Sequence, residues 1–399
     1  MPVRRNAVTL LLAGASIWSA CAIYDRSLLL PVTSEKDDSG AADGSAADSS
    51  VGDSAASDAG CQLLQPPPPP ATEDGTDNVD VTFAMSAFRL VPGGTASVNH
   101  PRAPLPMDID QRCTCPGPPS CTSPAGKQSC DADGGGDDAT GDMWATFASL
   151  SPSQFNDDAL NAGLRLGYNG LLVRLRQYNG GKNDTQVTLI GYESAGTVGV
   201  ENKMAAIPRY DGTDVWTVDP ASLVGGSGVD AGAGCEGNDT ICLPLIYDTK
   251  AYVSNGVVVG HISVPVTAGG ASTKLRVALT DVVLVAPLIA DGKSYRVDEG
   301  QFAGRWALPD FLDTLQSVPD PVDGMQGLCG ASPTYANVKQ IACDKRDVMS
   351  AQIKDNMGAQ CNALSITVSM SAVQAHLGPI FKPAPLAQRC GAGYTDSCP

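Results

Sequence analysis

Four aspartates in the cysteine-rich part of the chain have the spacing of a calcium-binding loop. Positions 1, 3, 7 and 12 of a twelve-residue count are occupied by Asp131, Asp133, Asp137 and Asp142, and Gly136 stands where such loops turn sharply. Carboxylate oxygens are the ligands that Ca²⁺ prefers in proteins. The spacing therefore identifies a candidate site, with calcium as its cofactor.

The same stretch departs from an EF-hand loop in three ways. Gly135 stands at position 5, Asp142 replaces the usual glutamate at position 12, and no convincing helix can precede Cys130. These departures favour a solvated acidic loop over a calcium loop.

A second group of aspartates surrounds a tryptophan. Asp211, Asp214 and Asp219 flank Trp216, and such a set can combine a calcium ion with an aromatic platform for a sugar. The alternative, which we favour, is a set of ordinary turn aspartates beside a tryptophan of the core.

Catalytic motifs are nearly absent from the sequence. It contains no H-E-x-x-H zinc motif and no G-x-S-x-G nucleophile motif. Glutamate occurs six times, and the adjacent Asp298 and Glu299 must point to opposite faces of a strand. We therefore expect a non-enzymatic module that binds a glycan, an envelope component or a partner protein. The alternative is a secreted hydrolase that acts on polysaccharide through carboxylates brought together by the fold.

The overall charge excludes one class of partner. The 399 residues carry a formal net charge of −17, whereas nucleic-acid binding depends on Lys and Arg neutralising phosphates. We expect no nucleic-acid partner.

The N-terminus has the pattern of an export signal. Residues 1–20 combine a positive start, a short apolar core and small residues before Cys21. Trp18-Ser19-Ala20-Cys21 resembles a bacterial lipobox, which implies that Cys21 carries acyl chains that anchor the protein to a membrane. Ala22 after the cysteine resembles the outer-membrane class of lipoproteins. The alternative is ordinary cleavage and a soluble secreted protein.

Residues 21–70 are predicted to form an acidic, disordered tether. Aspartates recur every five residues from Asp38 to Asp58, a period that fits neither a helix nor a strand. Residues 66–70 are five prolines, which favour a stiff polyproline spacer. A signal, a lipobox and such a tether resemble the surface lipoproteins of Gram-negative soil bacteria.

Residues 71–399 are predicted to fold as a β-rich region. Many short apolar segments separated by turns predict an antiparallel β-sandwich or jelly roll with a few short helices. Residues 170–192 resemble one hairpin of laminin-G or concanavalin-like domains. Residues 92–141 are predicted to be a cystine-stapled, aspartate-rich excursion, and residues 307–361 a partly helical insertion.

Local signals place several elements. Residues 79–91 and 364–373 are predicted strands, and Asn255-Gly256 predicts a tight type I′ hairpin. Ser151 and Pro152 mark the start of a predicted helix that ends near Gly167.

The thirteen cysteines indicate a disulfide framework. If Cys21 is acylated, an even set remains. The spacing favours a Cys235–Cys242 pair, and Cys390–Cys398 is a second candidate pair. A zinc site is the alternative for the cysteines between positions 113 and 130, but they lack the C-x-x-C pairs that structural zinc favours.

Overall fold

The computed structural model describes residues 65–90, 106–115, 117–124, 129–131, 135–150, 155–228, 232–269, 274–330, 332–387, 389–391 and 393–399. The signal segment, Cys21 and most of the tether lie outside these residues. Tyr252 donates a hydrogen bond of 2.6 Å to the Pro67 carbonyl, so the proline segment contacts the folded region.

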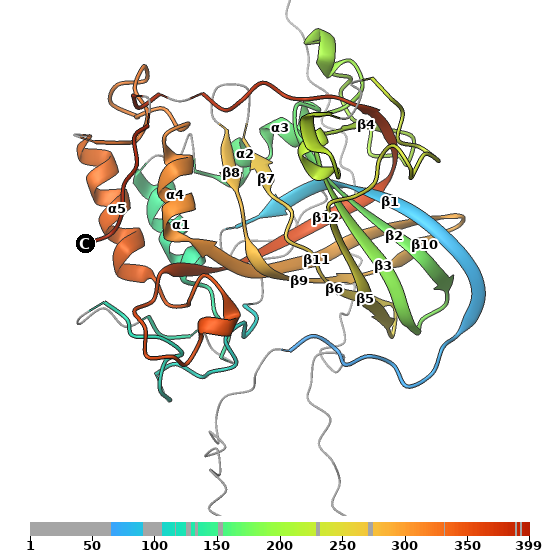
Figure 1. Ribbon diagram of the computed structural model, residues 1–399, viewed down its shortest axis with the longest axis horizontal. Helices are drawn as coiled ribbons and strands as arrows, with labels where there is room; N and C mark the ends of the chain where they lie inside the picture. Colours follow the sequence, from blue (N-terminus) through green and yellow to red (C-terminus); the bar gives the residue numbers. More distant parts are fainter. Residues whose placement is uncertain are drawn as a thin grey trace, which may run out of the picture. The chain divides into compact units, whose positions relative to one another are not determined.

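The described part of the chain is mainly β-sheet (Figure 1). Its strands are β1 (Gly75–Arg89), β2 (Gly170–Gly180), β3 (Asp184–Ser194), β4 (Val215–Val218), β5 (Ile246–Ser254), β6 (Val257–His261), β7 (Val266–Ala268), β8 (Leu275–Val277), β9 (Thr280–Pro287), β10 (Ile289–Asp291), β11 (Ser294–Ala307) and β12 (Ala363–Ile380). Its α-helices are α1 (Ala139–Leu150), α2 (Asp157–Leu160), α3 (Ala162–Arg165), α4 (Leu308–Leu315) and α5 (Pro333–Lys345). Short 3₁₀ turns are η2 (Val200–Asn202), η3 (Pro220–Ser222), η4 (Gly226–Gly228) and η5 (Gln352–Lys354).

The main sheet closes into an eight-stranded antiparallel barrel. Its order is β11-β9-β6-β5-β3-β2-β1-β12, and β12 pairs with β11 to complete the ring. β10 pairs with β11, β4 runs parallel to β12, and β7–β8 form a separate ribbon. The expectation of a sandwich or jelly roll is therefore wrong. Alternating strands predict a buried face in either architecture, and only the β11–β12 pairing distinguishes a closed sheet from two stacked ones.

The barrel core follows the alternation along each strand. Leu171, Val173 and Leu175 of β2 belong to the main core, whereas Leu172 belongs to a second cluster on the outer side of the wall. The second cluster forms because β4 and the loops around it cover that side. Both faces of β2 are therefore buried over its first half.

Helices α1, α4 and α5 gather at one end of the barrel (Figure 1). A run of aromatic contacts joins them to the wall, with Phe311 of α4 packed edge-on against Trp306 of β11 and stacked on Phe147 of α1. Residues 151–154, where the expected helix starts, lie outside the described part. Downstream, that helix is split at Asn161, whose side chain bonds the backbone of Phe88 in β1.

Disulfides connect distant parts of the described chain. The pairs are Cys115–Cys130, Cys121–Cys361, Cys235–Cys242, Cys329–Cys390 and Cys343–Cys398. Cys113 is also disulfide-bonded. The suggested Cys390–Cys398 pair is wrong, because each of these cysteines pairs with a residue more than 50 positions away. The zinc alternative for the four cysteines between positions 113 and 130 is excluded. All four are disulfide-bonded, so none has a thiolate that could bind zinc. Several disulfides are consistent with an exported or extracellular protein.

Among the described residues, no helix combines the length and the apolar character that crossing a membrane requires.

The Asn255-Gly256 turn allows a matched test of backbone conformation. Gly256 has φ +82° and open space around its Cα, whereas Gly324 also has open space but no positive φ. We expect Gly256→Ala to destabilise the fold by about 1 kcal/mol, because alanine is strained in the left-handed region. Gly324→Ala is the control and should be neutral or slightly stabilising. Urea unfolding measures both, and equal effects would contradict the type I′ assignment.

Candidate metal centre

A cluster of aspartates lies where two loops before α1 meet. Asp108 and Asp110 come from the segment after β1, and Asp137 lies two residues before the start of α1. One carboxylate oxygen of each lies within 4.8 Å of the other two. All three side chains are buried, with Asp137 only 2% exposed.

Backbone hydrogen bonds hold these carboxylates in place. Asp137 Oδ2 accepts from the amide nitrogens of Ile109 at 2.8 Å and Asp110 at 3.3 Å. The amide of Arg112 donates to Asp110 Oδ1 at 2.9 Å and to Asp108 Oδ1 at 3.2 Å. These hydrogen bonds fix the orientation of the carboxylates within their turn.

Two further aspartates border the cluster. Asp131 accepts a 2.6 Å hydrogen bond from the Thr114 amide, and the neighbouring Cys115–Cys130 disulfide joins the same two segments. Asp347, which follows α5, accepts hydrogen bonds from the amide and hydroxyl of Ser365 in β12. Three separate stretches of chain therefore bring acids to one place.

A buried arginine connects the cluster to the barrel wall. Arg305 of β11 is 1% exposed and donates to the Ile109 carbonyl at 2.8 Å and the Met349 carbonyl at 2.9 Å. Its guanidinium also forms a two-point pair with Asp355, at 2.8 and 2.6 Å. Much of its charge is therefore already balanced by Asp355.

The carboxyls are held in an environment that disfavours their charge. Burial, followed by the charge of Asp110, raises the pKa of Asp108 to about 7, and burial raises the pKa of Asp131 to about 6. Burial and hydrogen bonds to Ser365 act oppositely on Asp347, whose pKa is raised to about 7. The pKa of Asp137 lies well above its usual range because of burial and repulsion from Asp110. Without a cation, ionising all of these neighbouring carboxyls costs free energy, because their negative charges repel one another.

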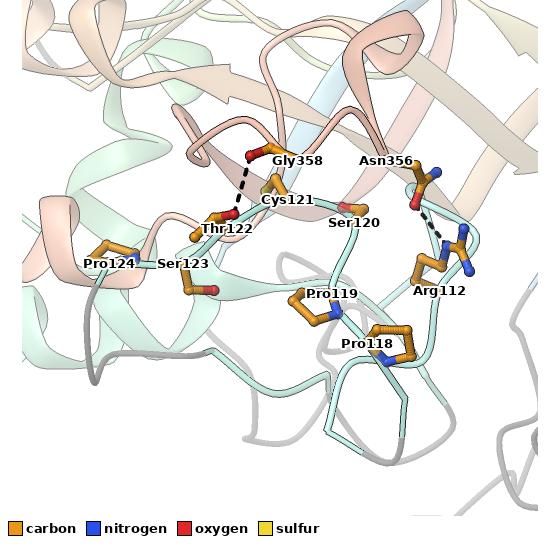
Figure 2. Close-up of a pocket in the computed structure, with 10 residues that line it drawn as sticks. All are labelled: Arg112, Pro118, Pro119, Ser120, Cys121, Thr122, Ser123, Pro124, Asn356 and Gly358. Atoms are coloured by element: carbon orange, nitrogen blue, oxygen red, sulfur yellow. Dashed lines mark hydrogen bonds between the residues drawn. The ribbon is translucent and has the colours of Figure 1, made fainter.

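A surface groove of about 840 Å³ is lined in part by Arg112 and Ser120 (Figure 2). The Arg112 amide, which bonds Asp108 and Asp110, connects this groove to the cluster. One wall carries Arg112, whose Nε donates to Asn356 Oδ1 at 2.9 Å, and Thr122 is bonded to Gly358 across the groove. The Cys121–Cys361 disulfide and the Thr122–Gln360 backbone bridge hold the walls together. Pro118, Pro119 and Ser120 line the other side.

The cluster uses part of the aspartate set that the sequence suggests. Asp131 and Asp137 border or belong to it, Asp133 lies outside the described residues, and so does the side chain of Asp142. The twelve-residue count missed Asp108 and Asp110, which lie more than 20 positions upstream of Asp131. The D-x-D pattern at 108–110, separated by two residues from C-T-C, is a signal that could have found them.

The second aspartate group forms local turns instead of a site. Asp214 accepts from the amides of Arg209 and Tyr210, Asp211 bonds Thr213, and Asp219 caps η3. Trp216 is fully buried. A sugar platform on Trp216 is therefore wrong, because a buried indole cannot stack on a ligand from solvent.

Three other large aromatic side chains are likewise too buried to stack on a sugar. Trp144, Tyr178 and Trp306 are all buried, at 3% exposure or less.

No family model, curated protein or solved structure matches the chain.

The raised pKa values predict how pH changes the stability of the metal-free protein. The unfolded carboxyls titrate near 3.8 and the folded ones near 6 to 7, so the folded state binds protons more tightly. This stabilising contribution is complete below the unfolded pKa and is lost as the pH rises through the folded values. With a chelator present, we expect the melting temperature to fall between about pH 5 and about pH 8.

The control is Asp137→Asn, which removes one repelling charge and should flatten that slope. Circular dichroism melting at several pH values measures both proteins. A melting temperature that rises over this range would contradict the assignment.

Proposed function

We propose that this chain is a lipid-anchored protein of the bacterial outer membrane or cell surface, and that its barrel is a non-enzymatic module that binds a glycan. The export signal, the lipobox at Cys21 and the acidic tether support the anchor. The disulfides support export. The tether holds the barrel away from the membrane, where a surface ligand is accessible.

The groove at Arg112 is the observation that carries the binding proposal. Asn356 holds the Arg112 guanidinium through Nε, and among the described residues no carboxylate forms an ion pair with Arg112. A guanidinium fixed in this way can donate to a carboxylate or to hydroxyls of a ligand. Hydroxyls of Thr122 and Ser123 and the flat rings of Pro118 and Pro119 complete the lining. An acidic polysaccharide has matching groups: carboxylates and hydroxyls for the guanidinium and the hydroxyls, and sugar rings for the proline rings.

The second candidate function is a carboxylate-dependent hydrolase acting on polysaccharide. Its support is Asp108, whose pKa is raised to about 7 by burial and by Asp110, because a general acid works best with a pKa near the operating pH. However, carboxyl pairs of glycosidases lie about 5–9.5 Å apart across a substrate. The oxygens here lie within 4.8 Å of one another, and the three carboxylates are buried and do not line the groove. We therefore favour binding over hydrolysis.

Arg112→Ala tests the groove. We expect the full-length protein to bind a polyuronate in a sedimentation assay, and Arg112→Ala to weaken that binding about 10-fold or more, because a charge-assisted hydrogen bond is lost. Arg209→Ala removes the same charge from an exposed turn and should bind like the unmodified protein. Equal binding by all three proteins would contradict the groove. Release of reducing ends would favour the hydrolase, and capture of an envelope protein in place of the polyuronate would favour a partner protein.

The cysteine count supports Cys21 as the acylated residue. All eleven described cysteines are disulfide-bonded, and Cys113 is the one whose bond is not among the five pairs above. We propose that Cys21, the cysteine of the lipobox, carries the lipid and that the other twelve cysteines form disulfides.

Mass spectrometry of the mature N-terminus tests the anchor. We expect a peptide that begins with acylated Cys21, and almost no free thiol in the denatured, unreduced protein. Cys21→Ser should move the protein from the membrane to the soluble fraction. A mature N-terminus at Ala22 would identify a soluble secreted protein instead.

A further inference from the structure

The cluster of Asp108, Asp110 and Asp137 has the dimensions of a coordination shell. Their nearest oxygens lie within 4.8 Å of one another. A Ca²⁺ ion binds oxygens at about 2.3–2.6 Å, so two ligands on opposite sides of the ion are about 4.6–5.2 Å apart. The three carboxylates can therefore bind one ion without a large backbone movement.

The negative charge of the cluster exceeds the nearby positive charge. Asp131 and Asp347 repel the same carboxylates, which brings the number of interacting acids to five. Arg305 acts on Asp110, but its guanidinium is already paired with Asp355. Buried carboxyls without a counter-charge hold protons, and a divalent cation that replaces these protons supplies two positive charges at one point.

An independent observation comes from Ser120. Its side chain is 1% exposed, and its hydroxyl oxygen makes no hydrogen bond of acceptable geometry. The same hydroxyl lies close enough to Asp110 to favour the ionised carboxylate. A buried hydroxyl without a partner costs free energy, and a metal ion is a partner that would satisfy its lone pairs.

We propose that Asp108, Asp110 and Asp137 bind one Ca²⁺ ion, with Ser120 Oγ as a further oxygen ligand. The donors are all oxygens, which suit a hard cation, and no histidine among the described residues belongs to the cluster. The four nearby cysteines are in disulfides and cannot act as thiolate ligands. Ca²⁺ fits better than Mg²⁺, because loops from separate segments supply an irregular ligand set and Mg²⁺ demands near-ideal octahedral geometry.

The ion also holds the groove together, although its binding does not depend on what the groove binds. Ser120 lines the groove and faces the cluster, and its carbonyl accepts a 2.6 Å hydrogen bond from the amide of Asn356 on the opposite wall. The Arg112 amide bonds both Asp108 and Asp110. Ion binding therefore restrains both walls through their own backbone.

Calcium binding is measured on the full-length protein in detergent after EDTA treatment and dialysis. Equilibrium dialysis with CaCl₂, followed by atomic emission, should find about one Ca²⁺ per chain at about 1 mM, a concentration at which extracellular calcium modules are filled. Calcium should raise the melting temperature, and MgCl₂ at the same concentration should raise it less.

Asp137→Asn keeps the shape of the side chain and an oxygen that can accept from Ile109, but it removes the charge. We expect it to weaken calcium binding at least about 10-fold. Asp211→Asn removes the same charge from an exposed turn and should bind within about 2-fold of the unmodified protein. Ser120→Ala should weaken binding a few-fold, and it gives the answer if Asp137→Asn does not fold.

Three results would overturn the proposal. The first is a folded protein that binds no calcium at about 1 mM CaCl₂. The second is a Ser120→Ala or Asp137→Asn variant that binds calcium as tightly as the unmodified protein. The third is tighter binding of Zn²⁺ or Mg²⁺ than of Ca²⁺.

Discussion

The pairing of β11 with β12 closes the sheet, and the other layers of the described structure depend on it. Ten residue pairs, from Arg296↔Val373 to Ala307↔Ala363, join the two strands. Without this seam most of the facing edges of β11 and β12 would carry unpaired backbone groups, because β10 and β4 pair with only one end of each strand. Closure also encloses the alternating apolar residues in one core and leaves an end that α1, α4 and α5 cover. The helices therefore have a surface to pack on only because the ring is complete.

Arg305 links the closed barrel to the loops that carry the aspartate cluster. It belongs to the seam strand β11, opposite Ser365, the residue that bonds Asp347. Its side chain reaches outward to the Ile109 and Met349 carbonyls, which lie in two loops far apart in sequence. Because a buried guanidinium must satisfy its donors, these loops are drawn to one point on the wall. The position of the site is in this sense a consequence of barrel closure, and the nearby disulfides maintain it.

Local features of the fold could be predicted because local physics determines them. The alternation in residues 170–192 predicts the β2–β3 hairpin. Asn255-Gly256 predicts the tight turn between β5 and β6, where both residues adopt positive φ. The sandwich was wrong because inward and outward alternation is common to sandwiches and barrels. At the site, the spacing rule found Asp131 and Asp137. It missed Asp108 and Asp110, because a cluster assembled from three segments has no single sequence period.

The sequence by itself determined a β-rich body and a loop region dense in acids, and it predicts an export signal and an even set of cysteines once Cys21 is set aside. These follow from residue type and short-range spacing, which act before any distant contact forms. Only the tertiary structure decided that the sheet closes, that Cys390 and Cys398 pair with other cysteines, and that the aspartates of two loops meet beneath Ser120. Each of these depends on contacts between residues far apart in the chain. Such contacts are selected by the packing of the whole core, and no local pattern encodes them.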